Sequence, residues 1–373
     1  MFDTSERPIV LVWEVSRACD LACDHCRAEA TPDRHPDELT TAEGKRLLES
    51  AREFGEGQVV VLSGGDPLKR DDLEELVAHG DDLGLRMALT PSGTDSVTRD
   101  RLQRLADAGL RRVALSIDAA DPAVHDGYRG EEGVLEGTLR AARAVEDAGI
   151  GLQVNTTVCE RTVDELPGVR DLVAELDAVR WSVFFLVPVG RGAALEPVSP
   201  ARADAVMDWL HRVEEEAPFA VKTTEAPQYR RVQLESGGVD PGDVDPERGP
   251  PATRPSVRAG DGFAFVSHVG DVTPSGFLPE PAGNVREDDL VDVYQNADLF
   301  ERLRDRAALG GKCGECEFRG VCGGSRSRAY AVTGDPLAAD PLCPYVPDDY
   351  DGPLPTRLAD DSAPPAGDDV GAD

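Results

Sequence analysis

Cysteine residues are the clearest indication of chemistry in this chain. The 373-residue sequence contains eight of them, and all but one fall into two groups, here called the N-terminal and C-terminal cysteine sets. The N-terminal set comprises Cys19, Cys23 and Cys26, and the C-terminal set comprises Cys313, Cys316, Cys322 and Cys343. Clustered cysteines in a reducing compartment are more often metal ligands or catalytic thiols than disulfides. The remaining cysteine, Cys159, ends a strand-like run and is predicted to be a buried, inert thiol.

The N-terminal set is one ligand short of a closed metal site. A structural zinc ion usually takes four protein ligands, whereas three thiolates can hold three irons of a [4Fe–4S] cluster and leave the fourth iron open. An open iron can bind a substrate or a cofactor. The four thiols of the C-terminal set suit a closed site, and tetrahedral sulfur ligation is compatible with either zinc or an iron–sulfur cluster.

Alternating apolar and amphipathic segments indicate the elements that must position these thiols. The predicted strands are 9–15, 58–63, 86–90, 111–118, 151–158 and 179–188, and the predicted helices are 40–54, 70–83, 97–108, 133–148, 163–176 and 200–215. This alternation predicts an α/β fold with a parallel sheet covered by helices, either an incomplete barrel or a doubly wound sheet. In both folds ligands bind at the carboxyl ends of the strands, where the N-terminal cysteine set lies.

Composition divides the rest of the chain into further segments. We expect a barrel domain over 1–216, a linker or long loop over 217–256, a smaller cysteine-rich domain over 257–346 and a disordered acidic tail over 347–373. The linker is predicted from its Gly, Pro and Asp content. The tail is predicted from its Asp-, Pro-, Gly- and Ala-rich composition, which cannot form a packed core.

The net charge of −32 restricts the environment and the partners. Acidic residues spread along the whole chain predict a halophilic protein, whose charged surface keeps it soluble in concentrated salt, rather than an acidic face for one basic partner. Nucleic-acid binding is disfavoured because no basic patch is visible. The sequence shows neither a signal peptide nor an apolar run long enough to span a membrane, so we expect a cytoplasmic protein with no membrane partner.

The N-terminal set and its surroundings resemble the radical SAM superfamily. The spacing Cys19-x3-Cys23-x2-Cys26 matches the CxxxCxxC signature of that superfamily, and it follows the first predicted strand as the signature does. The resemblance implies a partial (β/α)6 TIM-type barrel. It also implies that the three catalytic cysteines ligate a [4Fe–4S] cluster, with S-adenosyl-L-methionine (SAM) bound at the open iron.

Segments after the later strands resemble the SAM-binding segments of the same superfamily. Residues 64–67, Gly-Gly-Asp-Pro, resemble the GGEP motif that receives the SAM amino group, with Asp66 in place of glutamate. His25 stands at the usually aromatic position beside the adenine. The full set of implied cofactor-binding residues is His25, Gly64, Gly65, Asp66, Pro67, Ser92, Ser116, Asp118 and Val187. The alternative is an unrelated α/β protein with an incidental zinc triad. Under that alternative, each of these matches would be a separate coincidence.

The C-terminal set resembles the SPASM domain that follows the barrel in many radical SAM enzymes, in which seven cysteines hold two auxiliary clusters. Here Ser275 and Ser325 stand at two of those positions, and Val257 lies about where a third cysteine is expected. In the family, the three missing ligands belong to the cluster nearer the substrate, whereas the outer set is complete. The resemblance therefore implies one auxiliary [4Fe–4S] cluster, with zinc in the outer site as the alternative.

Longer stretches such as 13–30 and 124–130 resemble a radical SAM group that acts in haem biosynthesis. Those enzymes oxidatively decarboxylate two propionates of Fe-coproporphyrin III to vinyls and need a reducing electron donor such as ferredoxin or flavodoxin. An anionic porphyrin requires cationic anchors, and His268 is in addition a candidate iron ligand. The candidate anchors are Arg27, Arg129, Lys222, Arg230, Arg231 and His268.

Other functions remain open from the sequence. The serine substitutions leave room for haem d1-type modification of a tetrapyrrole. A SPASM maturase that modifies a ribosomally made peptide is a further alternative, although only a few residues precede the first strand and such enzymes often have a peptide-binding extension there. An iron–sulfur electron carrier would not explain the SAM-binding segments.

Overall fold

The computed structural model describes residues 3–239 and 256–355 of the chain. One sheet runs through it in the order β11-β10-β9-β1-β2-β3-β4-β5-β6-β7, and β8 pairs with β9. Strands β1 to β7 are parallel to one another. Their bounds are β1 (Val10–Ser16), β2 (Val59–Gly64), β3 (Arg86–Leu89), β4 (Arg112–Ser116), β5 (Gly151–Val158), β6 (Arg180–Phe185) and β7 (Ala220–Thr224).

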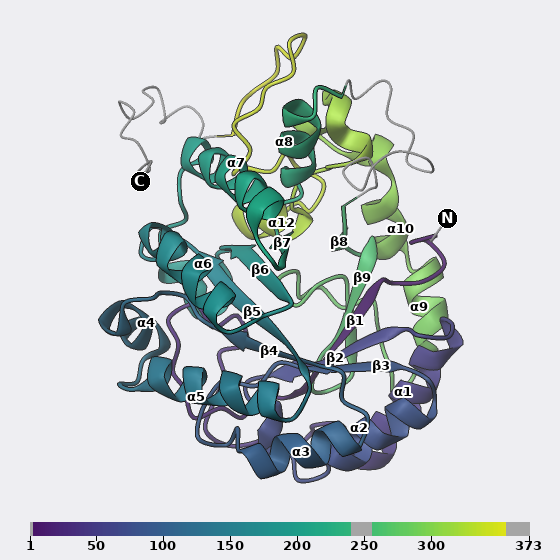
Figure 1. The fold of residues 1–373 in the computed structure, drawn as a ribbon. Coiled ribbons are helices and arrows are strands. Elements are labelled where there is room, and N and C mark those ends of the chain that lie inside the picture. Colours follow the sequence, from purple (N-terminus) through teal and green to yellow (C-terminus); the bar gives the residue numbers. More distant parts are fainter. Residues whose placement is uncertain (1–2, 240–255, 356–373) are drawn as a thin grey trace.

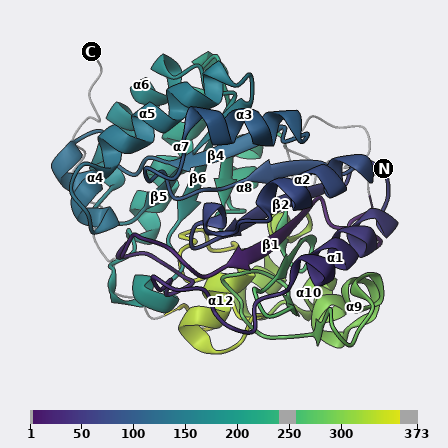
Figure 2. The same ribbon diagram turned by 90° about the horizontal axis from the view of Figure 1, so that it is seen from below.

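Helices connect these strands and form an outer layer around the curved sheet (Figures 1 and 2). Their bounds are α1 (Thr41–Glu53), α2 (Leu73–Asp82), α3 (Arg99–Asp107), α4 (Pro122–Arg129), α5 (Val134–Asp147), α6 (Leu166–Glu175), α7 (Pro200–Glu216) and α8 (Tyr229–Ser236). Alternate strand residues such as Trp13, Val113 and Trp181 are fully buried in the core beneath this layer. The residues between them therefore face the concave side of the sheet. Within residues 3–239 and 256–355, no helix is long and apolar enough to cross a membrane.

The strand order distinguishes the two predicted architectures. A doubly wound sheet reverses its strand order at a switch point and carries helices on both faces. Here the order runs from β1 to β7 without a reversal, and the sheet is open at β7 rather than closed. The prediction of a partial TIM-type barrel is therefore confirmed, and its concave side is the place for ligands.

The packing of α1 on β1 fixes the strand that leads into the N-terminal cysteine set. Thr40 and Glu43 form a capping box, in which each side chain accepts a hydrogen bond from the backbone of the other. One turn later, a Cβ at Gly44 would lie 2.4 Å from the Trp13 ring, so only glycine lets α1 approach β1 so closely. The start of the helix and the position of the strand are thus both set by local sequence.

The C-terminal residues extend the same sheet beyond β1. β9 is parallel to β1, with Val10 opposite Phe263, and β10 and β11 follow antiparallel to their neighbours. The elements are β8 (Arg258–Ala259), β9 (Gly262–Val266), β10 (Asp271–Thr273), β11 (Gly283–Asn284), α9 (Leu290–Asn296), α10 (Asp298–Arg304), α11 (Gly311–Glu315) and α12 (Arg326–Thr333). The division of the chain into separate domains stays a prediction.

Two parts of the chain differ from the sequence-based expectations. The predicted linker, 217–256, begins with regular structure, since it contains β7 and α8. β7 has few apolar residues and forms because its backbone pairs with β6, an effect that periodicity does not reveal. The sequence analysis did not predict α4, although the Asp121 cap and the proline in the first turn are a signal for a helix start. Residues 240–255 of the linker and 356–373 of the tail lie outside the described residues.

Candidate active site

The loop after β1 holds the N-terminal cysteine set at the carboxyl edge of the sheet. The Cys19 amide donates to the Thr31 carbonyl (2.8 Å), which closes the loop, and the Cys26 amide donates to the Cys23 carbonyl (3.2 Å). Cys19 and Cys23 are buried, Cys26 is partly buried, and all three pack in one small cluster. The structure therefore brings the three thiols together in a single loop.

The surroundings of these thiols affect their ionisation. Burial raises the pKa of Cys19 and of Cys23 above the usual value. The Arg129 guanidinium opposes this effect at Cys23, because its Nη1 lies 3.9 Å from the sulfur. Buried thiols with raised pKa values are poor free nucleophiles, whereas a bound metal stabilises the thiolate form directly. The site thus suits metal ligation better than thiol catalysis.

Gly64 and Gly65 follow β2 and lie directly against the start of the cysteine loop. The Gly65 amide donates to the Ser16 carbonyl (2.9 Å), and the Asp66 amide donates to the Ala18 carbonyl (2.7 Å). A Cβ at Gly64 would lie 2.0 Å from the Ser16 carbonyl oxygen, and a Cβ at Gly65 would lie 2.5 Å from that of Ala18. Only glycine permits this contact, which fixes residues 64–67 beside the three thiols.

The Asp66 carboxylate is buried and already has three donors. One oxygen accepts from the Leu68 amide (3.1 Å), and the other accepts from the hydroxyls of Ser96 (2.8 Å) and Thr94 (3.3 Å). Pro67 follows in the short turn that Asp66 caps. Asp66 therefore fixes the conformation of this loop, in addition to any contact it makes with a ligand.

His25 is part of the cysteine loop, and its side chain stacks on an aromatic ring. Its imidazole is parallel to the Tyr128 ring, with 4.5 Å between the ring centroids. Burial lowers the pKa of His25 to about 3, and the nearby Arg129 acts in the same direction, so the ring is neutral at pH 7. Among the described residues, its Nδ1 is buried without a hydrogen-bond partner. A neutral, flat and partly unsatisfied ring is suited to contact a heteroaromatic ligand.

A buried ion pair lies between His25 and the end of β4. Arg129 Nη2 is 2.5 Å from Asp118 Oδ2, and both residues are almost fully buried. The other Asp118 oxygen accepts from the Thr157 amide (2.7 Å). Burial disfavours the charged form of Asp118, but the Arg129 guanidinium outweighs it and holds the pKa of that carboxyl below its usual value. Arg129 thus joins β4 to the Cys23 thiol and is not free to anchor a substrate.

The segment after β6 closes the cysteine loop from the other side. Arg191 Nε donates to the Cys23 carbonyl (2.8 Å), and the Arg191 amide donates to the Cys26 carbonyl (3.1 Å). Val187 is buried just before this contact. Sequence reasoning placed this segment near the adenine but assigned no role to Arg191. The Gly190-Arg191 pair directly after a strand was the available signal.

Two serines from the predicted cofactor set lie on neighbouring parts of the same edge. The Ser92 hydroxyl, after β3, faces the Cys19 thiol and lowers its pKa slightly against the larger effect of burial. Ser116 is the last residue of β4 and lies opposite Asn155 of β5. The predicted SAM contacts therefore come from the ends of several adjacent strands.

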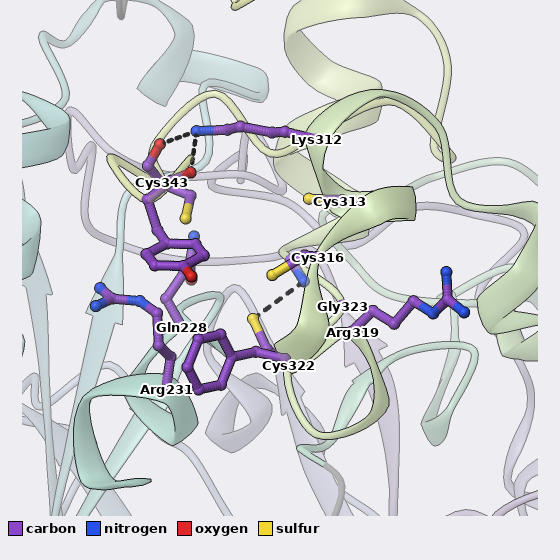
Figure 3. A pocket seen from close by; sticks show the side chains of 12 residues that line it. Gln228, Arg231, Lys312, Cys313, Cys316, Arg319, Cys322, Gly323 and Cys343 are labelled. Atoms are coloured by element: carbon purple, nitrogen blue, oxygen red, sulfur yellow. Dashed lines mark hydrogen bonds between the residues drawn. The ribbon is translucent and has the colours of Figure 1, made fainter. Parts of the chain in front are cut away.

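The C-terminal set surrounds a cavity at the far end of the chain (Figure 3). All four thiols line this cavity, together with Arg231 and Tyr345. Burial raises the pKa of Cys316 and of Cys322 to about 12. In the described ranges, no group of three or more His, Cys, Asp or Glu residues is placed around a single ion. Four thiols around a shared space can ligate either a zinc ion or an iron–sulfur cluster.

The two serines at lost cysteine positions share one acidic partner. Glu225, after β7, has φ of 55°, a left-handed conformation that is unusual for glutamate. Its Oε2 accepts from Ser325 (2.5 Å), and its Oε1 accepts from Ser327 (2.9 Å) and Ser275 (3.5 Å). All eight cysteines lie in the described ranges, and none is part of this group. A carboxylate thus accepts hydrogen bonds from both serines that the sequence analysis placed at SPASM cysteine positions.

Arg27 and His268 share a buried acidic partner on β1. Arg27 Nη1 lies 3.2 Å from Glu14 Oε1, and His268 Nδ1 lies 2.9 Å from Glu14 Oε2. Arg27 also stacks on the Phe265 ring. Burial disfavours ionisation of Glu14, but Arg27 and His268 together hold the pKa of Glu14 below its usual value. Glu14 is therefore a partner that both predicted anchors already have within the protein.

The two predicted anchors on α8, Arg230 and Arg231, already bind other side chains of the protein. Arg231 forms ion pairs with Asp204 and Glu235 and lines the C-terminal cysteine cavity. Arg230 donates to Gln233 (2.8 Å). These ion pairs hold α8 against α7 and occupy the Arg231 guanidinium, so the structure does not support it as a substrate anchor.

Lys222 differs from the other predicted anchors. It is partly buried on β7, and no carboxylate among the described residues lies within ion-pair distance. Burial lowers the pKa of Lys222 to about 8, and repulsion by Arg180 acts in the same direction. Lys222 is therefore a cation that the folded protein holds at an energetic cost.

That cost predicts a pH-dependent stability. The pKa of Lys222 is about 8 in the folded chain and 10.5 in the unfolded chain, so the unfolded chain binds more protons between these values. The contribution of this group to the free energy of unfolding is therefore least favourable below pH 8 and improves as pH rises to about 10.5. Lys222→Met should raise the free energy of unfolding at pH 7 by about 1–3 kcal/mol in urea titrations.

The control for this measurement is Lys45→Met. Lys45 is a more exposed lysine that pairs with Glu75 (2.6 Å), so its loss should change the free energy of unfolding by at most about 1 kcal/mol, and should not raise it. Equal effects of the two substitutions at pH 7 would contradict the assignment of Lys222 as an uncompensated cation.

Comparisons with known proteins agree with this geometry. The family model described as the Radical SAM superfamily matches residues 13–173. "AdoMet-dependent heme synthase" of Methanosarcina barkeri is 39% identical over 348 residues, which cover 93% of this chain and 99% of the relative. "Pre-heme d1 synthase" of Dinoroseobacter shibae is 30% identical over 357 residues, which cover 90% of this chain and 85% of that relative.

Solved structures show the same fold. SuiB of Streptococcus suis, in its crystal structure bound to S-adenosylmethionine, superposes with a TM-score of 0.70 at 19% sequence identity. The match covers 91% of this chain and 77% of SuiB. At this level of identity the similarity concerns the fold alone.

Proposed function

Since the chain belongs to the AdoMet-dependent haem synthase family of the radical SAM superfamily, we propose that it oxidatively decarboxylates porphyrin propionates, with Fe-coproporphyrin III as its substrate. The observation that carries this proposal is 39% identity across 99% of a haem synthase relative. The relative named for pre-haem d1 is less similar, at 30% identity, which favours haem formation over haem d1-type modification.

The N-terminal set would hold the SAM-binding [4Fe–4S] cluster. Three buried or partly buried thiols lie in one closed loop, and a glycine pair that tolerates no Cβ lies against that loop. The unsatisfied Nδ1 of His25 leaves a hydrogen bond available to the adenine. The residues proposed to contact SAM are His25, Gly64, Gly65, Asp66, Pro67, Ser92, Ser116, Asp118 and Val187.

A [4Fe–4S] cluster held by Cys19, Cys23 and Cys26 would supply the electron that cleaves SAM into methionine and a 5′-deoxyadenosyl radical, the hydrogen-abstracting species. The abstracted hydrogen comes from the propionate carbon next to the porphyrin ring and ends on 5′-deoxyadenosine. The bond to the carboxylate then breaks, CO2 leaves, a vinyl double bond forms, and one electron must leave for each propionate. The protein aligns the substrate and excludes water during this sequence.

The C-terminal set would hold one auxiliary [4Fe–4S] cluster that receives this electron. A series of hydrogen bonds links Glu225 to this cysteine set. The Ser325 hydroxyl bonds Glu225, the Ser325 amide donates to Asp340 (2.7 Å), and the Asp340 amide donates to the Cys313 sulfur (3.4 Å). A low-potential donor such as ferredoxin or flavodoxin would supply the electron that begins each cycle.

The cluster number is the first expected result. Anaerobically reconstituted protein should contain about two [4Fe–4S] clusters per chain by iron and sulfide analysis, because each cluster needs thiolates and the Glu225 region has none. Cys343→Ala should lower the content to about one cluster while 5′-deoxyadenosine formation continues. About three clusters in the unsubstituted chain would contradict the loss of the inner site.

Turnover tests the function itself. Reduced protein incubated with SAM and Fe-coproporphyrin III should yield haem b and 5′-deoxyadenosine, identified by absorption spectroscopy and mass spectrometry. Formation of 5′-deoxyadenosine with an unchanged porphyrin would reject the substrate and leave the superfamily assignment intact. A modified peptide or a haem d1-type product with other substrates would then identify the alternative.

A further inference from the structure

Three basic residues face the concave side of the sheet from strands β4, β6 and β7. They are Arg112 at the start of β4, Arg180 at the start of β6 and Lys222 in β7. In each case an adjacent residue packs beneath the outer helices, so strand alternation directs the basic side chain to the concave side. These buried neighbours are Val113, Trp181 and Val221.

The strand register places these residues relative to the SAM-binding edge. Ser116, Asn155, Ser182 and Lys222 form one row across β4, β5, β6 and β7. Ser116 and Lys222 are thus three strand spacings apart, about 14 Å along the sheet. Arg180 precedes Ser182 by two residues and therefore lies about 6.6 Å nearer the amino ends of the strands.

The group has no compensating carboxylate in the described part of the chain. No ion pair or side-chain hydrogen bond to an acidic residue involves Arg112, Arg180 or Lys222, although the chain carries 71 acidic residues. The charges instead act on one another, since Arg180 and burial together lower the pKa of both other residues. Partly buried like charges are unfavourable unless an anion binds among them.

The positions along the strands decide which part of a porphyrin could reach this group. Arg112 and Arg180 begin their strands, whereas the N-terminal cysteine set and the SAM contacts lie beyond the carboxyl ends. A propionate held by Arg112 or Arg180 at the amino ends would be on the side of the ring away from SAM, and one held by Lys222 would lie about 14 Å along the sheet from Ser116. The reacting propionate must instead approach the carboxyl ends, where 5′-deoxyadenosyl would form.

We propose that Arg112, Arg180 and Lys222 bind the two propionates that the reaction leaves unchanged, and so orient the other two toward SAM. This inference rests on the proposed function. Guanidinium and ammonium groups provide charge-assisted hydrogen bonds to carboxylates, and barrel folds of this kind bind their ligands within or above the concave side of the sheet. The group is then a positioning site common to substrate and product.

Affinities for substrate and product test the proposal, because haem b retains only the two unchanged propionates. Fe-coproporphyrin III and haem b are titrated into reconstituted wild-type protein, Arg180→Gln and Arg112→Gln, and the Soret band is followed without reductant. Each substitution should raise both dissociation constants by about tenfold. Weakened binding of Fe-coproporphyrin III alone would assign these residues to the reacting propionates and overturn the proposal, as would unchanged binding of both.

Arg111→Gln is the matched control. Arg111 is adjacent to Arg112 in sequence but is exposed and pairs with Asp81 (3.1 Å), so its loss should leave both affinities unchanged. Arg112 and Arg180 have no acidic partner among the described residues that their loss would leave unpaired. The melting temperatures of Arg112→Gln and Arg180→Gln should therefore be no lower than that of the wild type. Turnover by the wild-type protein is measured separately. If the wild-type protein forms haem but the variants bind both porphyrins as tightly as wild type does, only the proposed anion site is rejected. If the wild-type protein forms no haem, the proposed function is rejected.

Discussion

Replacing Cys23 with alanine is expected to reduce 5′-deoxyadenosine formation to background. Cys23 is buried in the loop after β1, and no other described cysteine lies close enough to this loop to replace it. Two thiolates cannot hold the cluster that three would hold with one iron open. The measurements are 5′-deoxyadenosine release by chromatography and iron content, which should fall to that of one cluster.

Cys159→Ala is the control for this result. Cys159 is equally buried, but its sulfur lies near Tyr128 Oη (3.8 Å) and Thr162 Oγ1 (3.6 Å), outside both cysteine sets. Its removal should leave iron content and 5′-deoxyadenosine formation near wild-type values. Retained activity in Cys23→Ala, or equal loss in both variants, would show that the N-terminal set does not hold the catalytic cluster.

Replacing Arg129 with methionine is expected to lower the free energy of unfolding by about 3–5 kcal/mol. The substitution leaves the Asp118 carboxylate, only 1% exposed, without its cation. The pKa of Asp118 should then rise, because burial would no longer be offset by the guanidinium. Cys23 would also lose the nearest cation, so 5′-deoxyadenosine formation should fall together with stability. Urea unfolding and the SAM cleavage assay measure the two effects.

Arg161→Met provides a matched comparison in the same region. Arg161 lies over the Tyr128 ring, with its Cζ 5.6 Å from the ring centroid, and pairs with Asp24 (2.6 Å), but both partners are about 40% exposed. An exposed pair contributes about 0–1 kcal/mol.

The double variant Arg129→Met with Asp118→Asn should recover part of the lost stability, because no buried charge remains unpaired. Equal destabilisation by Arg129→Met and Arg161→Met would contradict this account.

The local sequence was sufficient to predict those features that depend on the spacing of nearby residues. The three cysteines lie within eight residues, so the sequence placed them in one loop, and their spacing carried part of the resemblance that implied an open iron site. Periodicity predicted six parallel strands because each has a nearly continuous apolar run that packs beneath a helix. The carboxyl edge followed from chain direction, since every loop after a parallel strand emerges on that side.

Other features depended on contacts between residues far apart in the sequence. β7 contains a single well-buried apolar residue and is a strand only because β6 supplies its backbone partners. The strand order that distinguishes a barrel from a doubly wound sheet is likewise a property of pairing, which the sequence left open. The serines at lost cysteine positions were visible in the sequence, but their shared partner Glu225 was not.

The sequence by itself determined the chemistry class, because thiol spacing and strand periodicity are local properties. Only the tertiary structure decided which cations are available to a ligand. Arg129 and Lys222 were equivalent candidates in the sequence, yet one is paired with buried Asp118 and the other has no carboxylate partner in the described ranges. The physical reason is that the cost of a buried charge depends on its nearest opposite charge, and in this fold Asp118 and Arg129 meet only because α4 packs against the end of β4.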